Sequence, residues 1–405
     1  MKPKNFLYIL IAIAIIAIIA FIVYQFIPRG SGTLTTGTSQ TGSLPSVASG
    51  QFPSSSQPTQ AAPVATFNAN GANASSSQFG IISNDPALDY FVDAANTVVL
   101  IKTDGAIESI ANGKTSVIGS STISNVVSAA FSYDGKKVLE TSRVGTTTQA
   151  SVLDLTSQIW TRLPDGMQSP VWSPTNYQIA YLAPSTSGSE TLMTIDEGAA
   201  TNTKPFSIIP FNMEDLLLQW PNGNTIAISD RPSAYTTGSI WLLNIPSKTL
   251  SSVVYENLGA ESLWDASGSA LIFSAGSDNA GGQLVFRNAS SSEKTLSFST
   301  LPSKCTFNSP VTAGIMNPSL TIYCAVPSDQ GTFSIARLPD EYDQNIYFTN
   351  DDFYSIDSGT GLLTKIFSSS AINQNIDAKN MKVFNNVLFF VDRYDQKLYA
   401  LSLKG

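Results

Sequence analysis

The sequence predicts an all-β protein whose main part is a single β-propeller. Three observations lead to this fold. A motif of an aromatic residue, a short polar turn and an apolar strand recurs at intervals of 41, 48 and 44 residues, which is the length of a four-stranded propeller blade. Short strands separated by turn residues fill the chain from about residue 85 to its end. The long, almost unbroken apolar segment lies at the N-terminus, outside the repeats.

That N-terminal segment, Phe6 to Ile27, contains 22 residues. At 1.5 Å per residue a helix of this length spans about 33 Å, enough to cross a hydrocarbon core of about 30 Å. A cleaved signal peptide is the alternative, but its apolar part is shorter and ends at a small-residue cleavage site. Lys2 and Lys4 precede the segment and only Arg29 follows closely, which predicts a cytoplasmic N-terminus. We therefore expect residues 1–29 to form a cytoplasmic stub and a single transmembrane anchor.

Residues 30–84 consist mainly of Ser, Thr, Gly, Gln, Ala and Pro, and no charged residue stands between Arg29 and Asp85. So few bulky apolar side chains cannot offset the entropy lost on ordering. This segment is expected to be a disordered linker. The propeller is then expected to occupy residues 85–405, outside the cell membrane.

Five aromatic residues are the expected core anchors of five successive blades. Four of them open the motifs FSYDGKKVLE, WSPTNYQIAYL, WPNGNTIAIS and WDASGSALIFS, and the fifth stands 43 residues after the fourth. In chain order they are Phe131, Trp172, Trp220, Trp264 and Phe307. A related pattern late in several blades is an apolar strand that ends in Asp or Asn before a tight turn. These residues, expected to cap the turns through backbone amides, are Asp154, Asp196, Asn244 and Asp357.

The blade count follows from the two ends of the domain. Strands before Phe131 supply a first blade, and the C-terminal MKVFNNVLFFVDRYDQKLYALSLKG supplies three strands of a last one. The count is seven, with six or eight as alternatives. Because an open ring would leave an exposed sheet edge, an N-terminal strand near Asp89 to Lys102 is expected to complete the last blade.

The sixth blade carries the two cysteines of the chain. Cys305 falls on its innermost strand and Cys324 on the neighbouring one, so their side chains are expected to meet across the ladder as a disulfide. Outside the cytoplasm such a bridge persists.

The sixth blade also carries an insertion, SDQGTFSIARLPDEYDQNIYFTN, before its third strand. Four of its residues combine aromatic rings with acids on an expected surface loop, and we predict that they contact a partner: Glu341, Tyr342, Asp343 and Tyr347. The alternative is a loop that packs on its own blade.

The FSYDG and WSP motifs resemble the TolB-like, or PD40, β-propeller repeat, whose consensus has an aromatic residue, Ser-Pro-Asp-Gly and an apolar strand. The resemblance covers about 275 residues, from near Phe131 to the C-terminus. The sixth-blade pattern of KC, YCAVP, LPDEY and FYSIDSGTG is similar to that of membrane-anchored bacterial propeller proteins. Trp220 departs from the consensus with Pro-Asn-Gly after it, and Trp264 with Asp-Ala-Ser-Gly. The resemblance implies a propeller that binds proteins.

Composition limits the chemistry that the chain can perform. It contains no histidine, the commonest general base and zinc ligand, and its net charge of −8 disfavours nucleic acids. We expect no catalytic residue, metal or cofactor. The predicted function is a membrane-anchored, extracytoplasmic, protein-binding scaffold of the cell envelope without enzymatic activity.

The alternative function is a propeller glycoside hydrolase, or a carbohydrate-binding protein, that uses carboxylates at the channel mouth. Glycosidases need paired carboxylates and no histidine. The candidate pairs are Glu214 with Asp215 and Asp351 with Asp352. Adjacent residues on a strand point to opposite faces of a sheet, which counts against either pair.

Overall fold

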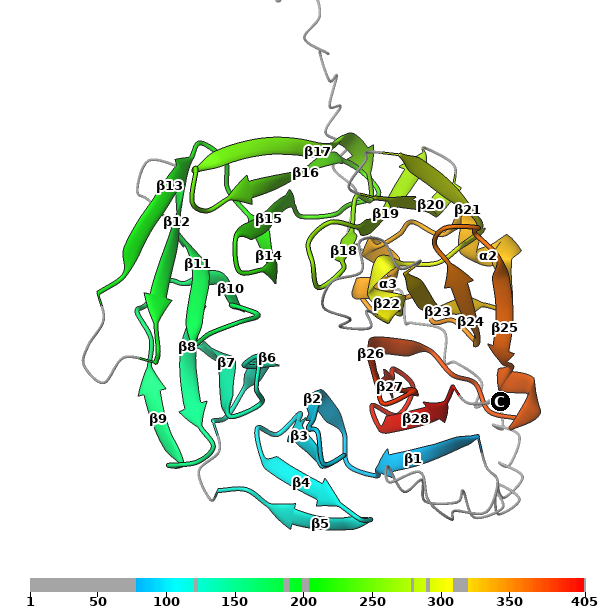
Figure 1. The fold of residues 1–405 in the computed structure, drawn as a ribbon, viewed down its shortest axis with the longest axis horizontal. Coiled ribbons are helices and arrows are strands. Elements are labelled where there is room, and N and C mark those ends of the chain that lie inside the picture. The colour runs from blue at the N-terminus through cyan, green and yellow to red at the C-terminus, as the bar shows by residue number, and fades with distance from the viewer. Residues whose placement is uncertain are drawn as a thin grey trace, which may run out of the picture. The chain divides into compact units, whose positions relative to one another are not determined.

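The computed structural model describes residues 78–119, 123–184, 189–198, 204–277, 280–288, 292–308 and 320–403. These residues form seven antiparallel four-stranded blades arranged in a ring, of which the fourth and fifth are joined into one eight-stranded sheet by a single pairing, Leu258 with Gly276 (Figure 1). The prediction of an all-β propeller with seven blades is confirmed. The predicted transmembrane segment and most of the predicted linker lie outside the described residues. Within the described part, no helix is both long and apolar enough to span a membrane.

Each of blades one to six is built from four strands in chain order, beginning with the innermost strand. Blade one consists of β2 (Ala87–Val92), β3 (Val98–Lys102), β4 (Ile107–Ala111) and β5 (Lys114–Val117). Blade two consists of β6 (Val126–Phe131), β7 (Lys137–Val144), β8 (Thr147–Asp154) and β9 (Ile159–Arg162). Blade three consists of β10 (Gln168–Trp172), β11 (Gln178–Pro184), β12 (Glu190–Asp196) and β13 (Phe206–Phe211).

The next three blades follow the same order around the ring. Blade four consists of β14 (Leu216–Asn222), β15 (Thr225–Asp230), β16 (Thr237–Asn244) and β17 (Thr249–Leu258). Blade five consists of β18 (Ser262–Trp264), β19 (Leu271–Ser277), β20 (Ala280–Arg287) and β21 (Glu293–Ser299). The short helix η1 (Pro302–Lys304) leads into blade six, which consists of β22 (Cys305–Asn308), β23 (Thr321–Pro327), β24 (Asp351–Asp357) and β25 (Leu363–Phe367).

Blade seven is completed by a strand from the other end of the domain. Its inner strands are β26 (Ala378–Phe384), β27 (Val387–Asp392) and β28 (Leu398–Ser402), and β1 (Phe79–Ser83) pairs antiparallel with β28 at the outer edge (Figure 1). Closure by an N-terminal strand is therefore confirmed, but the predicted segment, Asp89 to Lys102, was wrong because it supplies the first two strands of blade one. The ordered domain also begins before residue 85, since Phe79 packs into the core of blade seven.

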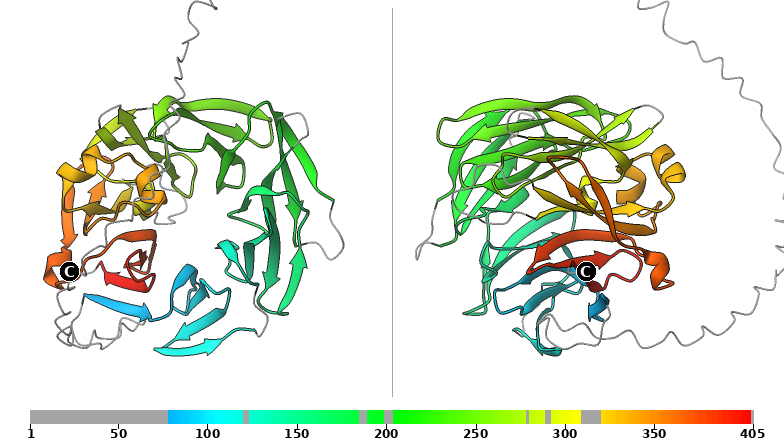
Figure 2. Two further views of the ribbon diagram at one scale, coloured as in Figure 1. Left: turned by 180° about the vertical axis from the view of Figure 1, so that it is seen from behind. Right: turned by 45° about the vertical axis from the view of Figure 1, so that its right-hand side comes forward.

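Figure 2 shows the ring from behind and turned. The five aromatic anchors occupy equivalent places in the strand order of their blades. All five lie on the innermost strand of their blade, from Phe131 on β6 to Phe307 on β22. Trp172 is buried in the apolar cluster that joins blades two and three, and its indole N–H donates to Ala130 O of blade two at 3.0 Å. The anchor thus fastens each blade to its neighbour, as adjacent sheet faces must do to bury their apolar sides.

The blade-six insertion forms two helices, α2 (Gln330–Ile335) and α3 (Asp340–Asp343), between β23 and β24. Phe333, Leu338 and Tyr342 bury themselves against Leu301, so the loop packs onto the propeller, as in the alternative reading of the sequence. At Gly281 of β20 a Cβ atom would stand 2.6 Å from Phe333 O. Glycine is therefore required where α2 meets blade five. A disulfide joins Cys305 to Cys324, which are direct partners in the β22–β23 register, and this prediction is confirmed.

Candidate binding site

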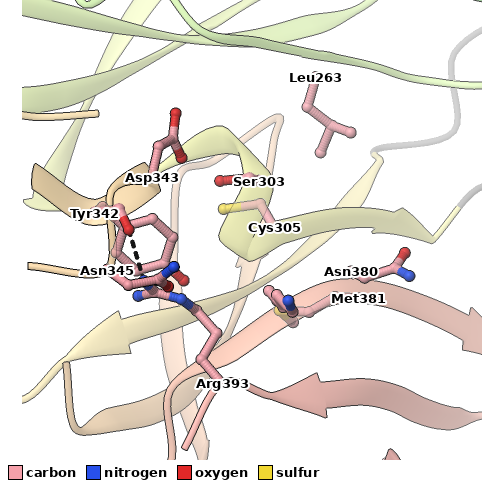
Figure 3. Close-up of a pocket in the computed structure, with 10 residues that line it drawn as sticks. Leu263, Ser303, Cys305, Tyr342, Asp343, Asn345, Asn380, Met381 and Arg393 are labelled. Carbon is pink, nitrogen blue, oxygen red and sulfur yellow. Dashed lines mark hydrogen bonds between the residues drawn. The ribbon is translucent and has the colours of Figure 1, made fainter. Parts of the chain in front are cut away.

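A pocket of about 540 Å³ lies where the innermost strands of blades five, six and seven meet the blade-six insertion (Figure 3). This volume is within the range of small-molecule sites, about 300–1,000 Å³. Its walls come from strands β18, η1–β22 and β26, from α3 with the turn that follows it, and from the residue after β27. The lining residues are Leu263, Ser303, Cys305, Tyr342, Asp343, Asn345, Lys379, Asn380, Met381 and Arg393.

A buried ion network lies behind two of these walls. The Lys304 ammonium, fully buried, lies 2.7 Å from Asp351 Oδ2 and 2.5 Å from Asp377 Oδ1. It also donates to Thr349 Oγ1 at 2.9 Å, and the Tyr342 hydroxyl donates to Asp377 Oδ1 at 3.0 Å. Blade six, its insertion and blade seven are therefore joined by one set of charged hydrogen bonds.

The charges in this network offset one another. Burial alone would lower the pKa of Lys304, but the charges of Asp351 and Asp377 outweigh it and hold the lysine pKa well above its usual value. Burial likewise opposes ionisation of Asp377, yet Lys304 and Arg393 bring its pKa below the usual value. Desolvation raises the pKa of Asp351, whose Oδ1 atom has no hydrogen-bond partner among the described residues.

Arg393 is held rigidly in the pocket wall. Its Nη1 donates to Asp377 Oδ2 at 2.8 Å, and its Nη2 donates to Tyr342 O at 2.6 Å and Asn345 Oδ1 at 2.9 Å. Figure 3 shows Arg393 beside Tyr342 and Asn345. The guanidinium carbon also lies 3.6 Å from the centre of the Tyr342 ring. Because both guanidinium Nη atoms are already engaged, Arg393 shapes the pocket and orders the insertion. It has little capacity left to bind a ligand.

Two other pocket residues carry charged side chains that, unlike Arg393, are not paired with neighbouring groups. The side chains of Lys379 on β26, which is half-buried, and of Asp343 at the end of α3, which is exposed, have no hydrogen-bonding or ionic partner in the part of the chain that the structure describes. Desolvation and the charge of Arg393 lower the pKa of Lys379, while Asp377 opposes the shift. Desolvation raises the pKa of Asp343, against the charge of Arg393. Asp343 and Met381 lie on different sides of the pocket (Figure 3).

The four residues predicted to contact a partner lie in different environments. Glu341 Oε2 accepts from Arg337 N at 3.1 Å, and Tyr347 is half-buried against Phe333. Tyr342 is only 4% exposed, so its ring supports the pocket from within the protein. Asp343 faces the pocket. Contact between these residues and a partner stays a prediction. Tyr342 is buried, so its side chain is not on the surface.

The carboxylate pairs of the hydrolase alternative do not form shared sites. Asp215 binds Arg231 through two hydrogen bonds of 2.8 and 2.9 Å. Asp351 faces Lys304, whereas Asp352 accepts from Lys365 at 2.7 Å on the other face of the strand. Among the described residues, no group of three His, Cys, Asp or Glu side chains is placed to hold a metal ion.

Sequence reasoning missed most residues of the pocket and its support. Lys304 ends η1, Asp377 and Lys379 lie just before and on β26, and Arg393 follows β27, and no local motif links the three segments. One signal was available. In a chain with only 13% charged residues, Lys304 stands directly before Cys305, which opens the strand that the sequence predicts to be innermost in its blade.

No protein-family model and no curated protein matches the chain. Similar solved structures include the tricorn protease (11% identity, 82% of this chain and 34% of that chain, TM-score 0.49) and TolB from Acinetobacter baumannii (18% identity, 51% and 52%, TM-score 0.38). A third is an oligogalacturonate lyase in complex with manganese (13% identity, 79% and 89%, TM-score 0.48). The chain spans about a third of the tricorn protease chain and about half of the TolB chain.

The class of protein is thus a seven-bladed β-propeller. The strand topology is that of a β-propeller, which is the fold implied by the resemblance to the TolB-like repeat.

The expectation that the protein is not an enzyme is contradicted by these comparisons. Besides the tricorn protease and the lyase, the similar structures include prolyl endopeptidases and an acylaminoacyl peptidase from Pyrococcus horikoshii. The lack of histidine excludes a histidine-dependent site within this chain, but it does not exclude an enzyme.

Proposed function

We propose that the protein is a ligand-binding β-propeller, anchored in a cell membrane by Phe6 to Ile27 with its propeller outside the cytoplasm. The pocket between the blade-six insertion and β26 is its binding site. The observation that carries this proposal is the pocket itself, whose volume suits a small ligand and whose walls are fixed by buried ion pairs. A preformed, rigid site lowers the ordering cost of binding.

The membrane part of the proposal is supported by the apolar segment, by Lys2 and Lys4 before it and by the disulfide, which persists in oxidising compartments. It is tested with single cysteines introduced at Pro3 and at the exposed Ser251. A maleimide that cannot cross membranes should label Ser251→Cys in intact cells and should label Pro3→Cys only after lysis. Equal labelling of both positions in intact cells would contradict this topology.

The binding part is tested by blocking the pocket. Ser303 presents its side chain to the pocket, so Ser303→Trp fills it, whereas Ser251→Trp adds the same bulk to the exposed outer strand β17. Full-length protein in detergent is heated with amino acids, sugars, nucleotides and dicarboxylates in turn. A ligand at about 100 times its Kd adds about 2.7 kcal/mol of stability.

We expect one class of compound to raise the melting temperature of the wild type and of Ser251→Trp, but not of Ser303→Trp. If no class does so, or if Ser303→Trp responds equally, the pocket is not a ligand site.

Protein docking is a second candidate function, favoured by exposed apolar side chains on and beside the insertion. Ile335 and Ile346 are exposed on the insertion itself, and Tyr394 stacks on Phe348 beside it. A photo-crosslinking amino acid at Ile346 should yield a discrete protein adduct in intact cells. The same probe at Val117, exposed on the outer strand of blade one, is the control. Identical adducts from both positions, or none, would exclude docking at this surface.

A further inference from the structure

The pocket contains one cation and one anion without partners, although almost every charged group around it is paired. Lys382, three residues after Lys379 on β26, binds Asp89 at 2.7 Å. Asp340, three residues before Asp343, accepts the backbone N–H of Ala234 at 2.5 Å. Lys379 and Asp343 have no such partner among the described residues.

Their positions place the two charges in different walls. Lys379 belongs to β26 of blade seven, and Asp343 ends α3 in the blade-six insertion. Arg393 contributes no free charge between them, because its Nη atoms donate to Asp377, Tyr342 and Asn345. The pocket therefore presents a positive group on one side and a negative group on the other, with the apolar Leu263 and Met381 in its walls.

Lys379 is half-buried, and an unpaired charge in a partly desolvated place is unfavourable until an opposite charge reaches it, whereas Asp343 is exposed and open to a ligand. Desolvation has lowered the pKa of Lys379 and raised the pKa of Asp343, which is the direction expected where counter-charges are missing. The groups that oppose these shifts are Asp377 for the lysine, and Arg393 and Arg231 for the aspartate. A single ligand with both kinds of charge would satisfy both walls.

We propose that the pocket binds a small zwitterion, an amino acid or a short peptide, whose carboxylate pairs with Lys379 and whose ammonium pairs with Asp343. This inference rests on the proposed ligand-binding function and names the chemical class of the ligand. The Leu263 and Met381 walls would receive the apolar part of the ligand, and the Ser303 hydroxyl offers a hydrogen bond.

The test uses full-length protein in detergent and isothermal titration. The probes are an equimolar mixture of the twenty proteinogenic amino acids, the same amino acids N-acetylated, the same amino acids as C-terminal amides, and a mixture of dipeptides. Acetylation removes the ammonium and amidation removes the carboxylate. We expect the wild type to bind free amino acids or dipeptides at least tenfold more tightly than either blocked form. Comparing the affinity for free amino acids with the affinity for dipeptides shows which length of ligand the site prefers.

Two charge-neutralising variants assign each charge to its partner. Asp343→Asn should abolish the preference for free over N-acetylated ligand and keep the preference over the amide. Lys379→Gln should do the reverse, and Lys379→Arg should retain the wild-type preference. The matched controls are Lys114→Gln and Asp165→Asn, whose side chains are exposed on blade one and beside blade two. Neither control should change either preference.

Some outcomes would overturn the inference. If blocked and free ligands bind equally, or if neither pocket variant changes the selectivity, the ligand is not a zwitterion. When another class of compound still protects the wild type but not Ser303→Trp, this inference fails while the proposed ligand-binding function stands. If no compound of any class binds, both fail.

Discussion

Lys304 is a buried lysine whose ammonium is shared by two carboxylates from different segments. Replacing it with Met would leave Asp351 and Asp377 buried without their main counter-charge, and breaking a buried pair in this way costs about 3–5 kcal/mol. We expect Lys304→Met to lower the free energy of unfolding by this amount. Urea unfolding monitored by tryptophan fluorescence measures it.

The matched control for Lys304 is Lys365, which binds Asp352 at 2.7 Å with a side chain that is 47% exposed. Exposed ion pairs contribute about 0–1 kcal/mol, so Lys365→Met should cost less than about 1 kcal/mol. Equal losses in the two variants would show that the Lys304 network is not a desolvated ion cluster.

The buried carboxyl of Glu140 on β7 is expected to make the stability of the protein depend on pH. It is 1% exposed, neither carboxylate oxygen has a partner among the described residues, and burial raises its pKa from 4.5 to about 7. The folded protein therefore keeps this proton to a higher pH than the unfolded chain does. Stability should fall as the pH rises from about 4.5 through about 7.

Glu140→Gln removes this titration. At pH 8 the free energy of unfolding of this variant should exceed that of the wild type by on the order of 2–3 kcal/mol. The difference should be smaller at pH 5. The control is Glu108→Gln, which removes a partner that lies 2.9 Å from Lys102 and should destabilise the protein at pH 8. A gain for Glu140→Gln that is the same at both pH values would contradict the assignment.

Local chemistry could be predicted from the sequence wherever it depends on neighbours along the chain. The Asx residues that end the third strands do cap their turns: Asp154 Oδ1 accepts from Thr156 N and Ser157 N, and Asn244 Oδ1 accepts from Ser247 N. Asp357 caps Thr360 N in the same way at 2.7 Å. Partners only two or three residues away follow from the residue type alone, whereas Lys304 and Asp377, 73 residues apart, do not.

At the scale of elements, the disulfide ties the two inner strands of blade six. Cys305 and Cys324 are separated by 19 residues, and closing a loop of this size stabilises a protein by about 3 kcal/mol in the chain-entropy model. The double variant Cys305→Ala, Cys324→Ala should lose about this free energy of unfolding. Dithiothreitol should reproduce the loss in the wild type and have no effect on the double variant. Sensitivity of the double variant to the reductant would contradict this assignment.

The element that the sequence misplaced is the closing strand. Phe79–Ser83 directly follows a long Ser- and Gln-rich segment. The strand has only five residues, which is too short a pattern to identify it from the sequence. Asp89 to Lys102 has a stronger β pattern because it belongs to the centre of blade one. Pattern strength reports that a segment forms a strand, but not which sheet it joins.

At the scale of the whole molecule, β1 holds the ring closed. Phe79 is 6% exposed and stacks on Phe367 of blade six and Tyr399 of blade seven, with ring centres 5.3 and 5.2 Å apart. Loss of a buried phenylalanine costs about 3–5 kcal/mol. We expect Phe79→Ala to lower the free energy of unfolding by this amount in a single transition and to promote aggregation through the exposed edge of β28.

The control for Phe79 is Phe206, a phenylalanine that is 63% exposed on the outer strand of blade three. Phe206→Ala should change stability by less than about 0.5 kcal/mol. If Phe79→Ala behaves like Phe206→Ala, β1 does not close the ring.

The sequence by itself determined the architecture, because the blade is a local unit. An aromatic anchor, a turn and alternating strands recur about every 44 residues, and each hairpin depends on residues near one another in the chain. It also placed Cys305 opposite Cys324, since neighbouring strands of one hairpin share a register. These features need no knowledge of how the ring is assembled.

The tertiary structure alone decided the site and the closure. The pocket brings together residues from Leu263 to Arg393 that share no motif, and it exists only because blades five, six and seven converge under the insertion. The pairing of β1 with β28 joins segments more than 300 residues apart. Such contacts are set by the curvature of the closed ring, a property of all seven blades together that no local stretch of sequence encodes.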